Sequence, residues 1–442
     1  MHDPVENPSL DLTIIIPSKN EGPNLNLLLP ALQETLTRLP IRAEILVVDA
    51  ASDDGTPDIV ASHGARYLRE KGRGYGHAIL TGAQAARGDY FITMDADLSH
   101  PTKFIEDLWA AREEGDLVIA SRYVEGGGAD QPFFRLLLSK ILNAFFRYGL
   151  SLTALDLTSG YRLYHRRVFE GLEIRFTSFV FLVELLLTIM KRGGHVAEVP
   201  FHYEPREEGR SNARIIQFGI DYCRLFYQMW RIRNACTFPD YDWRACHSRI
   251  PLQRWWHRQR ARHIQRFAGT HLPMVDVGCG SSTLLTKLPD GAIGLDLSGE
   301  KLRFMARTGH PLLRGNGCHL PVADESIATV VCSQLLEHTP EDGAPLLDEL
   351  ARVVCPGGVL VLGTPDYGRW QWKAIEWAYN KIVPYPYTRE QVTHYDRAHL
   401  FDALSARGFT VRNHAYIGGA ELIVRCEKEE APEGQDNATH EK

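Results

Sequence analysis

Residues 90–97 read YFITMDAD, an apolar run that ends in two aspartates separated by one residue. Residues 275–280 read VDVGCG, a second apolar run that ends in a glycine-rich turn. Short apolar runs that end in polar or turn residues are typical of buried parallel strands. The two turns differ in chemistry and lie about 180 residues apart in the chain. They predict two domains with separate functional sites.

Further apolar runs surround each turn. In the first half they cover residues 13–16, 44–48 and 117–120, and residues 24–39 have helical periodicity between the first two. A polar, arginine-rich stretch at residues 231–266 then interrupts the pattern. The second half repeats it, with runs at residues 292–295, 329–332 and 358–362 and an expected helix at residues 283–288. Strands that alternate with helices predict an α/β fold in both halves.

The chain has 442 residues, which is more than one ordinary domain needs. We expect four segments along it. They are a first α/β domain at residues 10–232, a connecting helical segment at 233–268, a second α/β domain at 269–427, and a disordered polar tail at 428–442.

The composition narrows the class of protein. Hydrophobic residues make up 44% and charged residues 24%, which is typical of a folded globular chain. A formal net charge of -6 argues against nucleic acid as a partner. The eight cysteines form no Cys-x-x-Cys pair, no signal peptide is recognisable, and no apolar run is long enough to span a bilayer. We therefore expect a cytoplasmic protein.

The first turn has the chemistry of a metal site. Ligands of open α/β sheets collect at the carboxyl ends of strands, and Asp95 and Asp97 follow such a strand. Two carboxylates there suit Mg²⁺ or Mn²⁺ bound against a diphosphate. An Asp-x-Asp pair by itself is equally typical of a solvated turn. Acidic residues also follow the first two strands, at Glu21 and Asp49, so three acidic strand ends should converge.

Taken together, the motifs of the first half resemble those of family-2 glycosyltransferases, in particular the dolichyl-phosphate mannose synthase-like group. The resemblance covers residues 12 to 214 and rests on IIIPSKNEGPN, VVDAASDDGT, MDADLSHP, ASRYVEGGG, DLTSGYRLYHRRVFE and REEGRSN. It implies a GT-A nucleotide-diphospho-sugar transferase fold. It also implies transfer of a hexose, of mannose or glucose type, from a nucleoside diphosphate sugar to a polyprenyl or dolichyl phosphate with inversion.

The same resemblance assigns residues by position. It implies that Pro17, Glu21 and Asp49 hold the nucleoside, and that Asp95 and Asp97 hold the metal and the diphosphate. In the late loop, Arg206 would close on the diphosphate. A phosphate nucleophile is already ionised near neutral pH, so no strong general base is needed. Glu184 is the only candidate base, and a structural role for it is equally open.

The acceptor side rests on residues 132–148. Arg135, Ser139, Asn143 and Arg147 recur every four residues, with Phe134, Leu138, Ile141 and Phe145 on the other side, which predicts an amphipathic helix. The resemblance implies that Arg122, Arg135 and Ser139 bind the lipid phosphate. The apolar face would then rest among lipid headgroups, on the inner face of a membrane. The alternative is a surface helix packed on the core. Residues 215–230 could likewise form an interfacial helix or a helix packed on the core.

The glycine turn suggests a nucleoside site. Gly278 and Gly280 let the backbone approach a ligand closely, and Asp296 ends the next strand, where it can accept hydrogen bonds from ribose hydroxyls. A dinucleotide site is the rival, but residues 281–283 read SST where a third glycine is usual.

The second half resembles class I S-adenosylmethionine-dependent methyltransferases over residues 270 to 425. The segments VDVGCGSS, GLDLS, GNGCHLPVADESIATVVCSQLLEHTP, ELARVVCPGGVLVLGTP and HLFDALSARGF carry the resemblance. It implies a Rossmann-like fold that binds S-adenosyl-L-methionine. Asp276, Gly278 and Gly280 would flank the methionine part, Asp296 the ribose, and Asn316 the adenine amino group.

The methyl acceptor is not set by these motifs. His338 could remove a proton from an acceptor hydroxyl, or could serve in capping or packing. The leading hypothesis is a bifunctional enzyme that binds a nucleoside diphosphate sugar and a polyprenyl phosphate at the membrane surface. The alternative is a glycosyltransferase with a soluble or polysaccharide acceptor, in which the second domain is a non-catalytic binding or scaffolding module.

Overall fold

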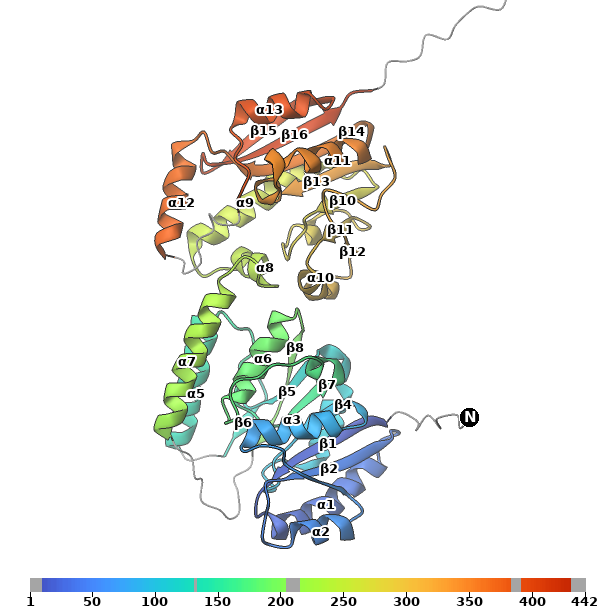
Figure 1. Cartoon of the computed structure of the whole chain (residues 1–442), viewed down its shortest axis with the longest axis vertical. Helices are drawn as coiled ribbons and strands as arrows, with labels where there is room; N and C mark the ends of the chain where they lie inside the picture. Colours follow the sequence, from blue (N-terminus) through green and yellow to red (C-terminus); the bar gives the residue numbers. More distant parts are fainter. Residues whose placement is uncertain (1–9, 131–132, 204–214, 383–390, 431–442) are drawn as a thin grey trace, which may run out of the picture. The chain divides into compact units, whose positions relative to one another are not determined.

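The computed structural model describes residues 10–130, 133–203, 215–382 and 391–430. The chain divides into two compact units, Met1–Trp230 and Arg231–Lys442 (Figure 1). Each unit contains one seven-stranded sheet, so each half of the chain is an α/β domain, as expected. No helix among the described residues combines the length and the apolar character needed to cross a membrane.

The sheet of the first unit has the strand order β3-β2-β1-β4-β7-β5-β8. Its strands are β1 (Leu10–Ser18), β2 (Ala43–Asp49), β3 (Arg66–Arg69), β4 (Gly88–Thr93), β5 (Leu117–Ser121), β7 (Arg162–His165) and β8 (Val196–Pro200). β6 (Gly128–Ala129) and β9 (His202–Tyr203) form a separate pair. All four strands predicted in this half are present. β7, which the sequence did not predict, runs antiparallel to β4 and β5.

Both faces of this sheet are covered by helices. They are α1 (Gly22–Thr37), α2 (Thr56–Ser62), α3 (Tyr75–Ala85), α4 (Ile105–Ala110) and α6 (Phe181–Lys191). Alternate residues of β1 point to opposite faces: Ile14 and Ile16 pack in the cluster that includes α1, and Ile15 packs in the cluster that includes α3 and α6. Because helices cover both faces of the sheet, its strands are continuous apolar runs.

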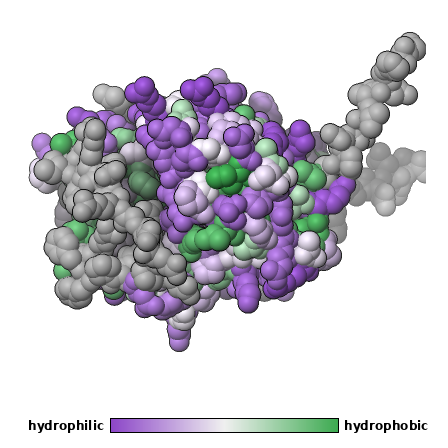
Figure 2. Space-filling view, turned by 90° about the horizontal axis from the view of Figure 1, so that it is seen from below, coloured by the Kyte–Doolittle hydropathy of each residue, from purple (hydrophilic) through white to green (hydrophobic). Residues whose placement is uncertain are grey.

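Two long helices, α5 (Phe133–Gly149) and α7 (Ile215–Arg233), pack against each other. Phe145 and Phe226 lie with ring centroids 4.3 Å apart, and Phe146 and Leu225 are fully buried. α5 is the amphipathic helix that the sequence predicted, and part of its apolar side is exposed: Leu138, Ile141 and Phe145 are 41%, 56% and 47% accessible. Seen from below, hydrophobic residues form patches within a largely hydrophilic surface (Figure 2).

The sheet of the second unit has the order β12-β11-β10-β13-β14-β16-β15. Its strands are β10 (Met274–Val277), β11 (Ile293–Asp296), β12 (Leu312–Arg314), β13 (Ile327–Ser333), β14 (Val354–Pro365), β15 (Phe409–Ile417) and β16 (Glu421–Lys428). The first five are parallel, and β16 is antiparallel to both β14 and β15. The strands predicted in this half are therefore present.

The helices of the second unit are α8 (Tyr241–Cys246), α9 (Pro251–Ala268), α10 (Gly299–Met305), α11 (Ala344–Val353), α12 (Trp370–Ile382) and α13 (Arg397–Ser405). α9, within the segment expected to connect the domains, packs Ile264 and Phe267 into the core of this unit. Lys428, the first residue of the expected tail, is the last of β16, and residues 431–442 lie outside the described residues.

The helix predicted at residues 283–288 is wrong. Only a 3-10 turn, Leu285–Lys287, forms there. Leu288 is extended with ψ of 163° because it precedes Pro289, and a residue before proline is disfavoured in the helical region. Ser282 also accepts a hydrogen bond from the Leu284 amide, 3.1 Å away, which favours a turn over a continuous helix.

Candidate functional site

The acidic strand ends of the first unit lie on adjacent strands. β2, β1 and β4 are parallel neighbours, and Ser18 of β1 pairs in register with Asp49 of β2. Asp95 and Asp97 directly follow β4 at the same edge. Asp49 and Asp97 are almost fully buried, at 1% and 7% exposure. The geometry thus brings together the acidic groups that the sequence placed at one edge.

Hydrogen bonds join the loops that follow β1 and β2. The Asn20 amide donates to Ser52 Oγ (2.8 Å), and the Gly22 amide donates to Asp54 Oδ2 (2.7 Å). Asp49 accepts from the Ser52 amide and hydroxyl and from the Tyr67 hydroxyl, 3.1 Å away. Sequence reasoning missed Ser52 and Asp54, although both lie in the quoted segment VVDAASDDGT.

Two residues predicted to hold the nucleoside lie beside these loops. Pro17 is half-buried within β1. Glu21 is half-buried at the start of α1, where its Oε2 accepts from Asn24 Nδ2 at 2.6 Å. Pro17 and Glu21 therefore lie next to the Asp49 loop, which suits a shared ligand.

The Asp95–Asp97 turn is held by its own neighbours. Asp97 Oδ1 accepts from the Ser99 amide (3.2 Å) and hydroxyl (2.5 Å), and the Asp95 amide donates to His100 Nδ1 (3.0 Å). The Tyr75 hydroxyl is near Asp95 Oδ1: a Cβ placed on Gly160 would lie 2.8 Å from the former and 3.7 Å from the latter.

The hydroxyl of Tyr75 is buried without a hydrogen-bond partner among the described residues. Burial and the Asp95 carboxylate raise its pKa well above the usual value. It therefore remains a neutral donor beside the aspartate pair, a role that the sequence did not reveal.

The aspartate pair fits a hard divalent cation. Mg²⁺ prefers oxygen ligands and is usually held by one or two carboxylates, with substrate phosphates and water completing its shell. Asp95 and Asp97 supply such carboxylates at a strand end. Within the described ranges, no cluster of three or more His, Cys, Asp or Glu side chains is arranged to hold a metal. Asp95 and Asp97 would be two ligands of such a cation, and a diphosphate would supply others.

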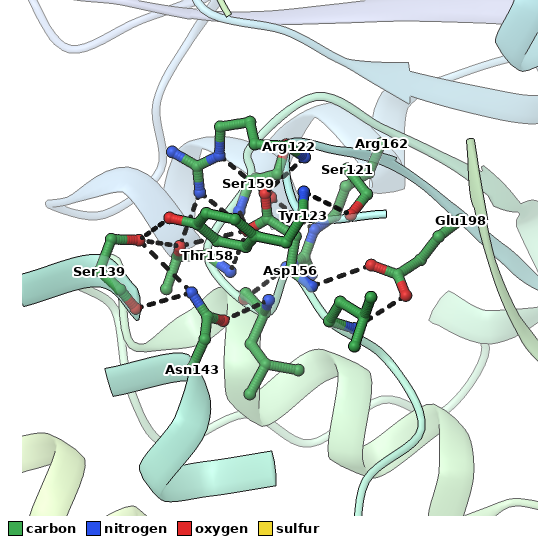
Figure 3. A network of polar contacts seen from close by, with 12 residues as sticks. Ser121, Arg122, Tyr123, Ser139, Asn143, Asp156, Thr158, Ser159, Arg162 and Glu198 are labelled. Atoms are coloured by element: carbon green, nitrogen blue, oxygen red, sulfur yellow. Dashed lines mark hydrogen bonds and ion pairs between the residues drawn. The ribbon is translucent and has the colours of Figure 1, made fainter. Parts of the chain in front are cut away.

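Arg122 is the centre of a polar network in the first unit (Figure 3). Its Nε and Nη2 donate to the two oxygens of Asp156 at 2.7 and 2.8 Å, and Nη2 also reaches Thr158 Oγ1 at 2.9 Å. The Asp156 side chain is fully buried, and its pKa, which burial alone would raise, is held below the usual value by Arg122. Since Nη1 is not used by Asp156, the guanidinium keeps donors for a ligand.

Ser139 of α5 joins the same network (Figure 3). Its Oγ accepts from the Tyr123 hydroxyl at 2.8 Å and lies 3.4 Å from Thr158 Oγ1. One turn later, Asn143 accepts from the Leu157 amide at 2.7 Å and so ties α5 to the strand-end loop. The structure thus brings Arg122 and Ser139 together, as predicted.

A cavity of about 470 Å³ opens beside this network. Its lining includes Arg122, Tyr123, Lys140, Asn143 and Arg147. Arg147 Nε is buried without a partner among the described residues, and Lys140 is exposed. The cavity therefore has three basic side chains, of which the sequence assigned only Arg122 to the acceptor. Two other predicted residues cannot be placed: the Arg135 side chain and all of Arg206 lie outside the described residues.

Glu184 has a structural role. It is 4% exposed and accepts from the backbone amides of Arg175 (3.0 Å) and Phe176 (2.9 Å). Burial raises its pKa, against the effect of these amides. Its carboxylate therefore orders the segment before α6, which was one of the two readings left open.

In the second unit, the glycine turn follows β10. Gly278 and Gly280 have φ of 73° and 55°, a region that side chains disfavour. The Gly280 amide donates to Asp296 Oδ2 at 2.9 Å, and the Ser298 amide donates to Asp296 Oδ1 at 2.8 Å. A Cβ at Gly280 would lie 2.9 Å from Asp242 Oδ2 of α8, so the turn is crowded as well as left-handed. Nothing in the sequence indicated Asp242.

Asp276 is the strongest indication of a ligand site in this turn. It is 2% exposed, and its Oδ2 has no hydrogen-bond partner among the described residues. Burial, with a smaller effect from Asp296, raises the pKa of Asp276 to about 7. A buried carboxylate without a partner suits a cationic ligand, and S-adenosylmethionine carries both an ammonium and a sulfonium. Asp276, Gly278, Gly280 and Asp296 therefore fit the predicted cofactor.

The other two residues predicted for this half are Asn316 and His338. Asn316 is exposed, and its Oδ1 accepts from the Cys318 amide at 3.0 Å, which leaves one lone pair of that oxygen for an adenine amino group. His338 is half-buried in a 3-10 turn (Leu336–His338) after β13. The preceding Glu337 is fully buried.

Comparisons with known proteins match each half of the chain to a family. The family model for glycosyl transferase family 2 matches residues 13–172, and the model for a methyltransferase domain matches residues 275–362. The GT-A and the Rossmann-like methyltransferase folds expected for the two halves are thereby confirmed.

Several curated relatives are similar to the first half. Dolichol-phosphate mannosyltransferase of Pyrococcus furiosus is 34% identical over 233 residues, which is 50% of this chain and 64% of that protein. Polyprenol monophosphomannose synthase of Mycolicibacterium smegmatis is 34% identical over 46% of this chain and 81% of that protein. Low-salt glycan biosynthesis hexosyltransferase Agl6 of Haloferax volcanii is 30% identical over 48% of this chain and 52% of that protein.

The chain spans less than two thirds of the length of the first and third of these relatives, and more than two thirds of the second. The acidic strand ends and the glycine turn lie within the matched regions. The chain belongs to glycosyl transferase family 2, and its second half is a methyltransferase domain of the class I, S-adenosylmethionine-dependent type.

Proposed function

We propose that the chain is a bifunctional enzyme. Its first unit transfers a hexose from a nucleoside diphosphate sugar to a polyprenyl phosphate with inversion, and its second unit transfers a methyl group from S-adenosyl-L-methionine. Two relatives bear names that state mannosyl transfer to dolichol phosphate or polyprenol phosphate. The basic cavity beside Arg122 is the observation that carries the proposal, because an anionic acceptor is what such a cavity would bind.

Donor and acceptor have separate groups in this proposal. Pro17, Glu21 and Asp49 hold the nucleoside, while Asp95 and Asp97 hold Mg²⁺ or Mn²⁺ against the diphosphate. The cation neutralises charge on the leaving diphosphate. Arg122 and Ser139, with Arg135 one turn before Ser139, hold the acceptor phosphate, and Arg206 closes on the diphosphate.

Lys140 and Arg147 add positive charge to the acceptor cavity. The phosphate oxygen attacks in its ionised form, so positioning and charge neutralisation lower the barrier and no general base is required. Exposed apolar side chains on α5 support an approach to the lipid surface, and we propose a peripheral location there.

In the second unit, Asp276 and the amides of the glycine turn hold the methionine part of the methyl donor, Asp296 holds the ribose and Asn316 the adenine. Bound in this way, the donor supplies an activated methyl carbon. His338, in the turn that follows β13, is a candidate for contact with the acceptor.

Sugar transfer to a short-chain polyprenyl phosphate tests the first activity, with GDP-mannose and UDP-glucose as alternative donors and a soluble hexoside as the rival acceptor. Asp97→Asn should abolish transfer with either donor. Lys140→Met should raise the KM for the lipid phosphate roughly tenfold, which corresponds to about 1.4 kcal/mol, and leave the KM for the donor unchanged. Lys191→Met, which removes an exposed lysine of α6 outside the cavity, is the matched control.

Transfer that prefers the soluble hexoside, together with an unchanged KM in Lys140→Met, would contradict the lipid-phosphate assignment. For the second activity, calorimetry with S-adenosylmethionine should show binding by the full chain that Asp296→Ala weakens. Binding that never leads to methyl transfer would make the second unit a binding module.

A further inference from the structure

Polar atoms without partners gather around the carboxyl ends of β13 and β14 in the second unit. Each of these atoms is buried and lacks a hydrogen-bond partner among the described residues. They are Ser333 Oγ, Glu337 Oε1, Gln371 Oε1, Trp372 Nε1 and Gln391 Nε2. Buried polar groups in native proteins are nearly always paired, so several unpaired groups in this region require an explanation.

Contacts among Glu337, Tyr367, Trp372 and Gln391 show that these residues, from separate segments, lie close together. Glu337 Oε2 accepts from Thr364 Oγ1 at 3.3 Å, and the Glu337 carbonyl accepts from the Val392 amide at 2.8 Å. The Tyr367 hydroxyl donates to Gln391 Oε1 at 2.8 Å, and the Tyr367 and Trp372 rings lie edge to face at 6.0 Å. The two atoms without partners, Glu337 Oε1 and Gln391 Nε2, are thus on neighbouring side chains.

This cluster lies next to the glycine turn. β13 pairs with β10, the strand that ends in the turn. A Cβ added to Gly278 would lie 3.0 Å from the side chain of Leu335, two residues before Glu337. The cluster therefore adjoins the place assigned above to the methionine part of the methyl donor, where an acceptor has to be bound.

The charges around the cluster describe the kind of acceptor that fits. Arg260 donates to both oxygens of Glu421, at 2.6 and 2.8 Å, so its charge is balanced by that carboxylate. Because Glu421 is paired with Arg260, the acidic character of the cluster comes from Glu337, which disfavours a phosphate or a carboxylate. The unpaired atoms include donors, on Gln391 and Trp372, and acceptors, on Glu337 and Gln371. Together with the Tyr367 and Trp372 rings, they suit a neutral compound with several hydroxyl groups.

We propose that this cluster is the acceptor site of the methyltransferase, that the acceptor is a neutral sugar, and that Glu337 takes the proton from the hydroxyl that becomes methylated. This inference rests on the methyltransferase activity proposed above. The acceptor oxygen gains the methyl carbon, and the electron pair of the broken carbon–sulfur bond stays on sulfur as a neutral thioether. The hydroxyl proton moves to Glu337 Oε1 and leaves a neutral carboxylic acid.

The environment of Glu337 agrees with this role. Burial raises its pKa to about 7, with a further contribution from Glu421, and Arg260 and Thr364 oppose the rise. A base whose pKa lies near the working pH transfers protons efficiently. Glu337 also has the free oxygen that a base needs, and it is buried while the neighbouring His338 is half-buried.

The test uses the full chain with Glu337→Gln, and with Glu341→Gln as a matched control at an exposed position. Calorimetry in the presence of S-adenosylhomocysteine measures binding of methyl α-mannoside and methyl α-glucoside, with hexose 6-phosphates and an amino sugar as comparison ligands. Methyl transfer to the same compounds is then followed from pH 5.5 to 8.5.

We expect the wild type to bind the neutral hexosides and to methylate them on oxygen. Glu337→Gln should bind hexoside and S-adenosylhomocysteine within about threefold of the wild type, while kcat falls at least ~100-fold. In the wild type, kcat/KM for the hexoside should rise tenfold per pH unit below about 7 and then level off. In Glu337→Gln this inflection should be absent, a result that a purely structural role would not give.

Three results would overturn the proposal: no binding of neutral hexosides by the wild type when S-adenosylhomocysteine is bound, methylation restricted to the phosphate-bearing or amino sugars, or a kcat of Glu337→Gln within tenfold of the wild type. Failure of the wild type to bind S-adenosylhomocysteine would instead count against the methyltransferase activity itself. The two failures are therefore distinguishable.

Discussion

Replacing Asp276 by asparagine should stabilise the second unit at alkaline pH. In the ligand-free protein the Asp276 carboxyl is buried and has a pKa of about 7, against 3.8 when unperturbed. Because the folded-state pKa is raised, the contribution of this group to stability is fully present below pH 3.8 and is lost as the pH rises through 7. At 1.36 kcal/mol per pKa unit, the ionised aspartate would cost roughly 4 kcal/mol at pH 8.

The pH dependence separates this effect from other consequences of the substitution. At pH 5 the same linkage gives a cost of roughly 1 to 2 kcal/mol, so the gain from Asp276→Asn should be about 2 to 3 kcal/mol larger at pH 8. The asparagine amide does not titrate, so any stability that it loses through its own unpaired donor is the same at pH 5 and pH 8. Solvent that penetrates the site would reduce the difference but not reverse its sign.

Urea unfolding followed by tryptophan fluorescence measures this difference, because six of the eight tryptophans lie in the second unit. Asp290→Asn, at an exposed position, is the control and should show no pH-dependent gain. Adding S-adenosylmethionine should stabilise the wild type more than Asp276→Asn, because only the carboxylate can pair with a cation. An equal gain from Asp276→Asn at pH 5 and pH 8 would refute the reasoning.

Three further predictions concern single contacts. Asp156→Asn removes the charged partner of the buried Arg122 and should lower the free energy of urea unfolding of the first unit by roughly 3 kcal/mol. Asp130→Asn, from an exposed pair with His202, should lower it by less than about 0.5 kcal/mol. Equal losses would contradict the argument that burial decides the cost. Gly280→Ala should weaken S-adenosylmethionine binding in calorimetry because the added Cβ meets Asp242. Gly309→Ala should leave this binding unchanged. It carries the same left-handed strain, roughly 1 to 2 kcal/mol, but its Cβ points into open space. Glu184→Gln should leave the kcat of sugar transfer within about twofold, since Glu184 binds backbone amides; a ~100-fold loss would make it the general base.

Patterns local in the sequence predicted most of the fold. The parallel strands were visible because each is a continuous apolar run, and the α5 helix was visible because its polar residues recur every four positions. β7 was missed because it begins at Arg162, a residue type that is seldom fully buried. Arg162 is nevertheless 0% exposed, because it donates to the carbonyls of Ser159, Leu182 and Leu157. Two of these acceptors are local, but Leu182 is twenty residues away.

The candidate sites show the same limit. Arg122, Asp296 and the glycines of the turn were found because they belong to compact motifs. Asp242 was missed because it reaches Gly280 from a helix about forty residues earlier in the chain. Lys140 was missed because a lysine on an amphipathic helix is usually solvated, and only the tertiary fold shows that it lines a cavity.

An oxygen without a partner distinguishes Asp276 and Glu337 from several buried acids of the framework. Asp156, Glu184 and Glu421 are buried, and each accepts hydrogen bonds from the protein's own donors. Such groups are complete without a ligand, and replacing them should affect stability first. Asp276 and Glu337 are equally buried, yet each has an oxygen without a partner among the described residues. Because an unpaired buried carboxylate is costly, its retention is best explained by a ligand that completes it. Both are in the second unit, beside the same glycine turn, where a cationic donor and a hydroxyl acceptor would have to meet.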